Sequence, residues 1–155
     1  MATEIERKFL VKEGWNPPGG GTVYRQGYLS TDPLRNVRVR ISDTDAFITI
    51  KGKTEGLSRP EFEYAIPAGD AEQLLKLCLP HIIEKTRYRI PADGLVWEVD
   101  VFHGVNAGLV LAEVELEAED QPFEKPAWVG REVSGDKRYY NAWLSAHPYG
   151  TWEEK

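Results

Sequence analysis

The chain has 155 residues, of which 41% are hydrophobic and 28% charged, and its formal net charge is −6. This length is typical of one domain, so residues 1–155 are expected to fold as a single unit. The only cysteine, Cys78, excludes an intramolecular disulfide, and the negative charge argues against long nucleic acid as the main ligand. Neither a secretion signal nor a long apolar run is present in the sequence, which predicts a cytoplasmic protein without membrane contact.

Charges of opposite sign are segregated along the chain. Residues 35–53 contain five cations and two aspartates, whereas residues 98–120 contain seven acids and no Lys or Arg. The first segment suits anionic groups, and the second suits divalent cations. If both segments face one cavity, a complex of metal and polyanion is the expected guest.

Most of the sequence alternates between apolar and polar residues with a period of two, which is typical of β-strands. Short turn-like segments such as 43–45 and 92–94 separate several of the runs and favour antiparallel neighbours. In chain order, the predicted strands are 3–11, 22–30, 36–42, 46–52, 60–66, 82–90, 95–102 and 109–117.

Two helices are expected. The first has Asp70 as its N-cap with Gln73 three positions later, and it ends at Pro80. A second is predicted to begin near Asp136 and to end before Pro148. The apolar face of the first helix comprises Ala71, Leu74, Leu75 and Cys78.

The charged positions of the predicted strands follow the same two-residue period. Glu4, Glu6 and Lys8 share one face of the first strand, and Arg38 and Arg40 share one face of the third. One interpretation is an ordinary sheet with one solvated face. However, like charges at this spacing repel each other unless a ligand neutralises them. A closed sheet whose charged faces line one lumen explains the set better.

Several motifs, taken together and in order, resemble those of the triphosphate tunnel metalloenzymes, also called the CYTH superfamily. Glu4-Ile5-Glu6-Arg7-Lys8 has the ExExK form found near the N-terminus of that family. The resemblance spans about residues 3 to 141. The other matching segments are Arg25-Gln26-Gly27-Tyr28-Leu29, Val37-Arg38-Val39-Arg40, Ile50-Lys51-Gly52-Lys53, Glu84-Lys85-Thr86-Arg87-Tyr88, Glu113-Val114-Glu115 and Asp136-Lys137-Arg138-Tyr139.

The resemblance implies a mainly β fold: a closed eight-stranded antiparallel β-barrel that forms a tunnel, with a few flanking helices. It also implies Mg²⁺ or Mn²⁺, two per site, and a small-molecule triphosphate held inside the barrel. The chain is most similar to the short single-domain bacterial members that hydrolyse inorganic triphosphate. A monomer and a homodimer are both compatible with the sequence.

The family's functional positions can be transferred residue by residue. The matching metal-binding acids are Glu4, Glu6, Glu113 and Glu115. The matching phosphate-binding cations are Lys8, Arg38, Arg40, Lys51, Lys53, Lys85, Arg87 and Lys137. Arg25 is a further expected tunnel cation, and the residues expected to carry the reaction are Glu4, Glu6, Lys8 and Glu115. The possible second line comprises Tyr28, Glu61, Glu63, Glu98 and Asp100.

Three functions are compatible with these residues. The favoured one is metal-dependent hydrolysis of inorganic triphosphate to pyrophosphate and phosphate. A second is another reaction in the same tunnel, either cyclisation of ATP as in class IV adenylate cyclases or hydrolysis of a nucleoside or thiamine triphosphate. A third is a polyphosphate-binding module without catalysis, which the large set of acids disfavours.

Overall fold

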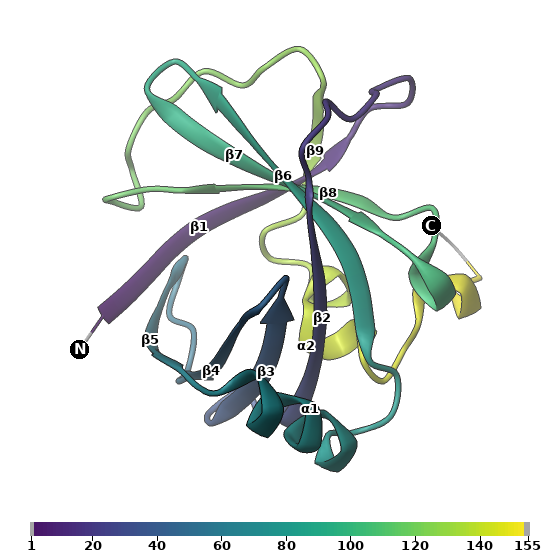
Figure 1. The fold of residues 1–155 in the computed structure, drawn as a ribbon. Coiled ribbons are helices and arrows are strands. Elements are labelled where there is room, and N and C mark those ends of the chain that lie inside the picture. The colour runs from purple at the N-terminus through teal and green to yellow at the C-terminus, as the bar shows by residue number, and fades with distance from the viewer. Residues whose placement is uncertain (1, 154–155) are drawn as a thin grey trace.

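The computed structural model describes residues 2–153, and its central feature is one antiparallel sheet (Figure 1). The strand order is β5-β4-β3-β2-β6-β7-β8-β1-β9, and an additional pairing of β5 with β1 closes the first eight of these strands into a barrel. The predicted closed eight-stranded barrel is therefore confirmed. The strands are β1 (Ala2–Val11), β2 (Thr22–Ser30), β3 (Asn36–Ser42), β4 (Asp45–Lys51), β5 (Ser58–Ala65), β6 (Ile83–Ala92), β7 (Leu95–Phe102), β8 (Val110–Glu115) and β9 (Val129–Glu132).

Strand β1 closes the barrel because it is long enough to serve several neighbours. Its residues 2–5 pair with β5, and its residues 6–10 pair with β8. In the second register Glu6 lies opposite Glu115, and Lys8 lies opposite Glu113. The end of β1 also pairs with β9, a short strand that the sequence pattern does not predict.

Helix α1 (Ala68–Leu77) covers the outside of the barrel against β2, β3 and β4. Ala71 and Leu75 are buried there against Val39 and Ile41. The predicted cap is wrong, because the N-cap position is Pro67 and no side chain caps the helix. Asp70 lies within the first turn, where its charge still complements the positive end of the helix dipole.

A second apolar layer covers the outer face of β7, β8 and β1. Trp97, Val99 and Val114 are fully buried in this layer. The loop after β1 contributes Trp15 to this layer, and the connection between β8 and β9 contributes Phe123 and Trp128. The aromatic rings meet at tilted or edge-to-face angles, with 5.8 Å between the ring centroids of Trp97 and Phe123.

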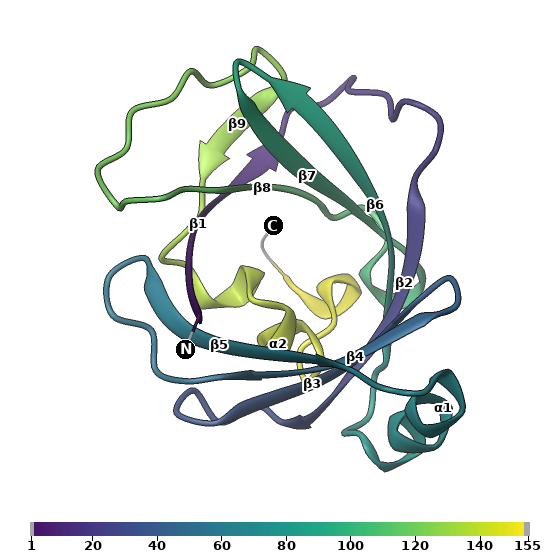
Figure 2. The ribbon, with the colours of Figure 1, turned by 60° about the vertical axis from the view of Figure 1, so that its left-hand side comes forward.

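The C-terminal segment folds differently from the predicted helix. It forms the 3₁₀ turns η2 (Lys137–Tyr139) and η3 (Tyr149–Thr151), with the four-residue helix α2 (Asn141–Leu144) between them. This segment crosses the inside of the barrel (Figure 2). No helix in residues 2–153 is both long and apolar enough to cross a membrane.

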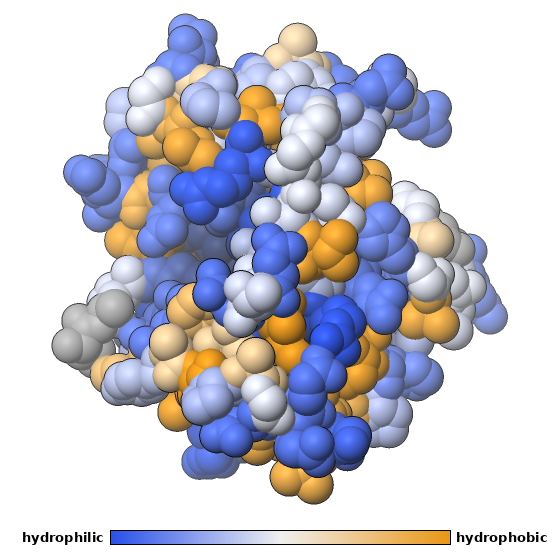
Figure 3. Space-filling view, viewed as in Figure 1, coloured by the Kyte–Doolittle hydropathy of each residue, from blue (hydrophilic) through white to orange (hydrophobic). Residues whose placement is uncertain are grey.

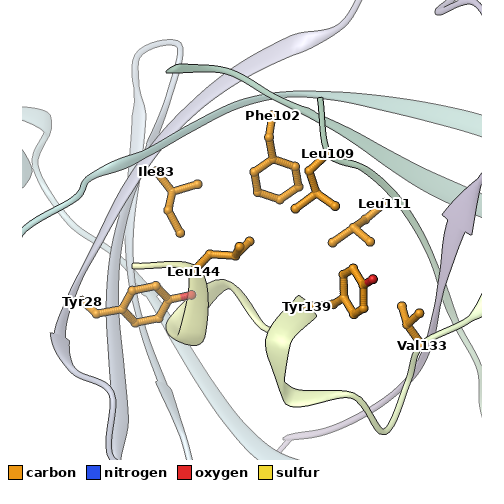
Figure 4. Packing of buried hydrophobic residues seen from close by; sticks show 8 residues of the cluster. All are labelled: Tyr28, Ile83, Phe102, Leu109, Leu111, Val133, Tyr139 and Leu144. Atoms are coloured by element: carbon orange, nitrogen blue, oxygen red, sulfur yellow. The ribbon is translucent and has the colours of Figure 1, made fainter. Parts of the chain in front are cut away.

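The C-terminal segment fills one end of the barrel with an apolar plug. Tyr139 and Leu144 pack against Tyr28, Phe102 and Leu111 from the strands (Figure 4). At this end the inner face of the strands is apolar, so charged side chains line only part of the lumen. The charged side chains line the remaining part of the lumen, between the plug and the opposite, open end of the barrel, and positions toward that open end are described as above the plug.

Candidate functional site

Charged side chains of seven strands gather inside the barrel above the plug. The molecular surface is hollowed near the centre of the view in Figure 3, and hydrophilic side chains surround that hollow. Exposure of these side chains increases along the lumen: Asp100 is 1% exposed, Glu4 is 14% exposed and Glu63 is 43% exposed. The lumen thus has a buried floor and an accessible mouth.

The floor is built on a buried aspartate. Asp100 on β7 accepts two hydrogen bonds from the guanidinium of Arg87, at 2.7 and 2.9 Å, and lies 2.7 Å from the ammonium nitrogen of Lys85. Burial opposes ionisation of Asp100, but Arg87 and Lys85 hold its pKa well below the usual value. Burial lowers the pKa of Lys85 to about 7, although Asp100 opposes this shift.

Two arginines of β3 extend the basic surface. Arg40 Nε donates to Gln26 Oε1 at 2.8 Å, and Arg38 Nη2 donates to Thr49 Oγ1 at 3.1 Å. Burial, together with the neighbouring Arg38 and Arg87, lowers the pKa of Arg40 to about 9. The Nε atom of Arg38 is buried and has no hydrogen-bond partner within residues 2–153. A buried donor without a partner is costly, and an anion in the lumen would satisfy it.

A tyrosine stands between two of these cations. The Tyr24 ring lies 4.7 Å from the Arg40 guanidinium carbon and 5.1 Å from that of Arg87. Both contacts are cation–π interactions, which partly offset the repulsion between the two guanidinium groups. Tyr24 therefore faces the lumen from β2 and helps to hold two basic side chains in place.

Two lysines pair with acids of the lumen, Lys51 near the mouth and Lys8 near the plug. Lys51 lies 2.8 Å from a carboxylate oxygen of Glu4 and 3.4 Å from one of Glu61. Lys8 lies 3.6 Å from Glu113 and donates a hydrogen bond to the backbone oxygen of Tyr139 in the plug. These lysines link the basic and acidic parts of the lumen.

The acids of the mouth repel one another. Burial and the charges of Glu113 and Glu4 raise the pKa of Glu6 well above its usual value. Burial and a hydrogen bond with Glu4 raise the pKa of Glu61 to about 7, and burial also raises that of Glu115. For Glu4 and Glu113, burial is outweighed by Lys51 and Lys8, so the pKa values of these two acids are lowered. The carboxyl groups that resist ionisation are therefore Glu6, Glu61 and Glu115, whose charged forms a nearby cation would stabilise.

The donor chemistry of the mouth fits a hard divalent cation. Glu6 and Glu115 lie opposite each other on β1 and β8, with Glu4 and Glu113 on the same two strands. Carboxylate oxygens are the ligands that Mg²⁺ and Mn²⁺ favour. In residues 2–153, however, no three His, Cys, Asp or Glu side chains are already grouped as a metal cage. The acids are spread around the mouth, and Lys51 and Lys8 hold Glu4 and Glu113 in ion pairs.

Most predicted lumen residues lie in this charged region. The contacts above bring together Lys8, Arg38, Arg40, Lys51, Lys85, Arg87, Glu4, Glu61 and Asp100. Glu63 joins them through Arg38, at 3.6 Å. Glu98 joins them through Arg87, at 3.4 Å. Tyr28 lies lower, in the apolar plug, with its hydroxyl 3.5 Å from Gln26 Nε2.

The structure places three predicted cations elsewhere. Arg25 points outward and forms an ion pair with Glu72 of α1. Lys53 is exposed in the loop after β4, where it lines a surface pocket of about 310 Å³ with Thr3 and Arg59. Lys137 is exposed on η2, with no described contact to the lumen.

Sequence reasoning also missed polar lumen residues. Gln26 and Thr49 are fully buried and contact the lumen arginines, and Asn141 contacts Lys85. Gln26 could have been found from the two-residue period of β2, because Tyr24, Gln26 and Tyr28 share one face of the strand. If that face points inward, Arg25 and Gly27 point outward. A side chain on Gly27 would lie 2.8 Å from Cys78, at the contact of β2 with the outer layer.

A closed antiparallel barrel whose lumen is lined by cations and carboxylates is suited to binding a small charged ligand. Comparison with known proteins identifies the family. The CYTH domain model matches residues 2–140, so the chain belongs to the CYTH domain family. An inorganic triphosphatase of Acetivibrio thermocellus is 46% identical over 99% of this chain and 100% of its own length. An inorganic triphosphatase of Nitrosomonas europaea is 42% identical over 92% of this chain and 97% of its own.

Solved structures support the same relationship. The crystal structure of an inorganic triphosphatase has a TM-score of 0.67 and 39% identity, and the match covers 92% of this chain and 97% of the other. A putative adenylate cyclase of Bacillus halodurans has a TM-score of 0.55 and 16% identity, over 77% of this chain and 84% of its own. At that identity the second likeness concerns the fold alone.

Proposed function

We propose that this protein hydrolyses inorganic triphosphate to pyrophosphate and phosphate inside the barrel, with Mg²⁺ or Mn²⁺ bound by the acids of the mouth. The observation that carries the proposal is the charged lumen, in which cations of β3 and β6 and acids of β1 and β8 line one closed barrel. The buried Nε of Arg38, which has no partner among the residues that the structure describes, adds a donor for a substrate oxygen. The two triphosphatase relatives, which match almost the whole chain, support this substrate.

The basic residues bind and orient the substrate. Arg38 and Arg40 present guanidinium groups from β3, and β6 presents the ammonium group of Lys85 and the guanidinium group of Arg87. Phosphoryl transfer requires little covalent chemistry from a protein, so fixing the triphosphate for in-line attack and offsetting its charge are the main tasks of these side chains. Asp100 keeps Arg87 and Lys85 in place by direct contact.

The acids of β1 and β8 complete the site. Glu4, Glu6, Glu113 and Glu115 would hold one or two divalent cations, and the raised pKa of Glu6 reflects burial and the mutual repulsion that such cations relieve. When bound, a cation of this kind supplies Lewis acidity that offsets phosphate charge and activates water. Lys51 and Lys8 keep the acids paired in the structure, so binding requires these ion pairs to rearrange.

Triphosphate is expected to stabilise the protein against heat. At about 100 times its dissociation constant, a ligand adds about 2.7 kcal/mol, which corresponds to a rise in Tm of roughly 5–10 °C for a protein of this size. Differential scanning fluorimetry in Ca²⁺ or without metal limits turnover during the measurement. Arg38→Ala should reduce the rise, whereas Arg35→Ala should keep it, because Arg35 is an exposed loop residue paired with Asp32. An undiminished rise in Arg38→Ala contradicts the proposed phosphate contacts.

Inorganic triphosphate is expected to exceed ATP in kcat/KM by at least tenfold, or about 1.4 kcal/mol. A cyclase must hold adenine in a pocket that supplies hydrogen bonds and an apolar slot. Phe62 and Tyr64 are exposed on β5, and Trp97 is buried in the outer layer, so none of these rings is available to adenine in the lumen. Tyr24 does face the lumen, but it is held between two arginines.

Chromatography of the products formed from ATP and Mn²⁺ separates the remaining reactions. ADP and phosphate are the expected products of any ATP turnover. Cyclic AMP with an equal amount of pyrophosphate would instead identify a cyclase. Binding of triphosphate without any metal-dependent phosphate release would identify a binding module, so a malachite-green phosphate assay with and without Mg²⁺ decides between an enzyme and a sensor.

A further inference from the structure

Asn141, the first residue of α2, contacts the basic floor from the C-terminal plug. Its Oδ1 accepts a hydrogen bond from Lys85 Nζ at 2.9 Å and another from Gln26 Nε2 at 2.9 Å. Both donors are buried: Lys85 is 1% exposed and Gln26 is 0% exposed. Asn141 lies one residue beyond the matched CYTH span, which ends at residue 140.

Two series of contacts run from Asn141 to two different arginines. On one side, Gln26 accepts from Arg40 at 2.8 Å. On the other side, Lys85 pairs with Asp100, which holds Arg87 through two hydrogen bonds. Both arginines then meet at the Tyr24 ring, so the contacts close on themselves. The resulting ring of side chains is Asn141, Gln26, Arg40, Tyr24, Arg87, Asp100 and Lys85.

We infer that Asn141 is a positioning residue for triphosphate binding, which sets Arg40 through Gln26 and Arg87 through Lys85 and Asp100. The inference rests on the proposed function. The six other members of the ring come from β2, β3, β6 and β7, and Asn141 alone comes from the C-terminal segment. That segment therefore sets the geometry of the basic floor in addition to filling the barrel end.

The physical reason is the satisfaction of buried donors. The ammonium group of Lys85 and the amide of Gln26 share one acceptor atom, so the position of that oxygen fixes both side chains relative to each other. Without it, the Gln26 amide loses its shortest acceptor and is free to rotate, which also moves the Oε1 atom that holds Arg40. Binding sites depend on such supporting contacts, because small displacements of charged groups weaken ligand binding.

The plug itself is anchored by other contacts, which permits a matched control. Leu144 is buried in the apolar plug, and Ser145 Oγ donates to the backbone oxygen of Ala142. Ser145 is 4% exposed, comparable to the lumen residues, but the hydrogen bonds described for it stay within the C-terminal segment. Ser145→Ala therefore perturbs the same segment and leaves the ring intact.

The experiment measures kcat and KM for inorganic triphosphate, together with Tm, in the full-length wild type, Asn141→Ala and Ser145→Ala. Asn141→Ala is expected to raise KM about tenfold with a smaller change in kcat, because it disturbs groups that bind the substrate before and during the reaction. Ser145→Ala is expected to keep KM within about twofold. Equal KM values in the two variants would overturn the inference.

A double-mutant cycle separates positioning from a purely structural role. Gln26→Met keeps the size of the side chain and removes the link to Arg40. If Asn141 acts through Gln26, the double variant raises KM by less than the product of the two single effects. A full product would overturn the inference. If Asn141→Ala yields too little folded protein, Asn141→Ser is too short to reach both donors and carries the same expectation.

Failure of the proposed function has a different result. A wild type that neither hydrolyses triphosphate nor shows a rise in Tm with it would contradict the triphosphatase itself. A wild type that does both, alongside an Asn141→Ala variant that matches Ser145→Ala in KM, contradicts the role of Asn141 alone.

Discussion

Glu6→Gln is expected to lower triphosphate turnover at fixed Mg²⁺ by at least a hundredfold, which corresponds to about 2.7 kcal/mol or more in the barrier. Glu6 lies opposite Glu115 across β1 and β8, and Glu4 lies two residues away on the same face of β1. Glutamine keeps the size of the side chain but removes the charge that the proposed cation requires. Steady-state phosphate release at several Mg²⁺ concentrations measures the effect, and Glu4→Gln and Glu115→Gln should behave alike.

Glu132→Gln is the control for this substitution. Glu132 lies on β9 outside the barrel and pairs with Arg7, whose side chain is 29% exposed. Removal of an exposed ion pair costs about 1 kcal/mol or less, so turnover should stay close to that of the wild type. If the control behaves as described, turnover near the wild-type value in Glu6→Gln would contradict the proposal that Glu6 binds the cation.

Most strands could be predicted because they alternate between apolar and polar residues, and because the charged positions in β1, β3, β6, β7 and β8 indicate the inward face. In β3, for example, Val37, Val39 and Ile41 form a uniform apolar face, so Arg38 and Arg40 must share the other. The register Glu6 to Glu115 follows from the closure of the barrel and was not available from the sequence.

In β2 the alternation is ambiguous, which explains the misplacement of Arg25. Apolar or aromatic residues occur there on both faces, as Val23 and Leu29 on one and Tyr24 and Tyr28 on the other. The charge of Arg25 suggested a lumen position, but the inward face carries Tyr24 instead. Neutral lumen residues escape a search for charge, although they hold the charged ones in place.

The C-terminal plug could not be predicted because its conformation depends on the space inside the finished barrel. Tyr140 and Trp143 suggest a helical spacing, but α2 is only four residues long. Tyr139 and Leu144 are placed by their contacts with strands distant in sequence. The role of Asn141 follows from that placement and from no local pattern.

Asp100→Asn is expected to destabilise the protein by about 3–5 kcal/mol, because removal of one member of a buried ion pair leaves the other charge uncompensated. Asp100 is 1% exposed, and it contacts both Lys85 and Arg87, which are 1% and 10% exposed. For a protein of this size the loss corresponds to a fall in Tm of about 6–20 °C. Urea unfolding at pH 7 measures it, with Glu132→Gln as the exposed counterpart that should cost about 1 kcal/mol or less.

The pH dependence gives this prediction a second, independent test. In the folded wild type, burial lowers the pKa of Lys85 to about 7, and Asp100 keeps it from falling further. In Asp100→Asn this opposing charge is lost, so the pKa of Lys85 should fall and the group should be neutral in the folded state near pH 7. In the unfolded chain Lys85 keeps its proton up to about pH 10.4. The free energy of unfolding therefore rises with pH wherever Lys85 is protonated in the unfolded chain but not in the folded protein. The deficit of the variant relative to the wild type should consequently be larger at pH 6, where only the wild type keeps Lys85 protonated, than at pH 9, where both folded forms have lost the proton. A deficit that is the same at both pH values would show that Asp100 does not control the charge of Lys85.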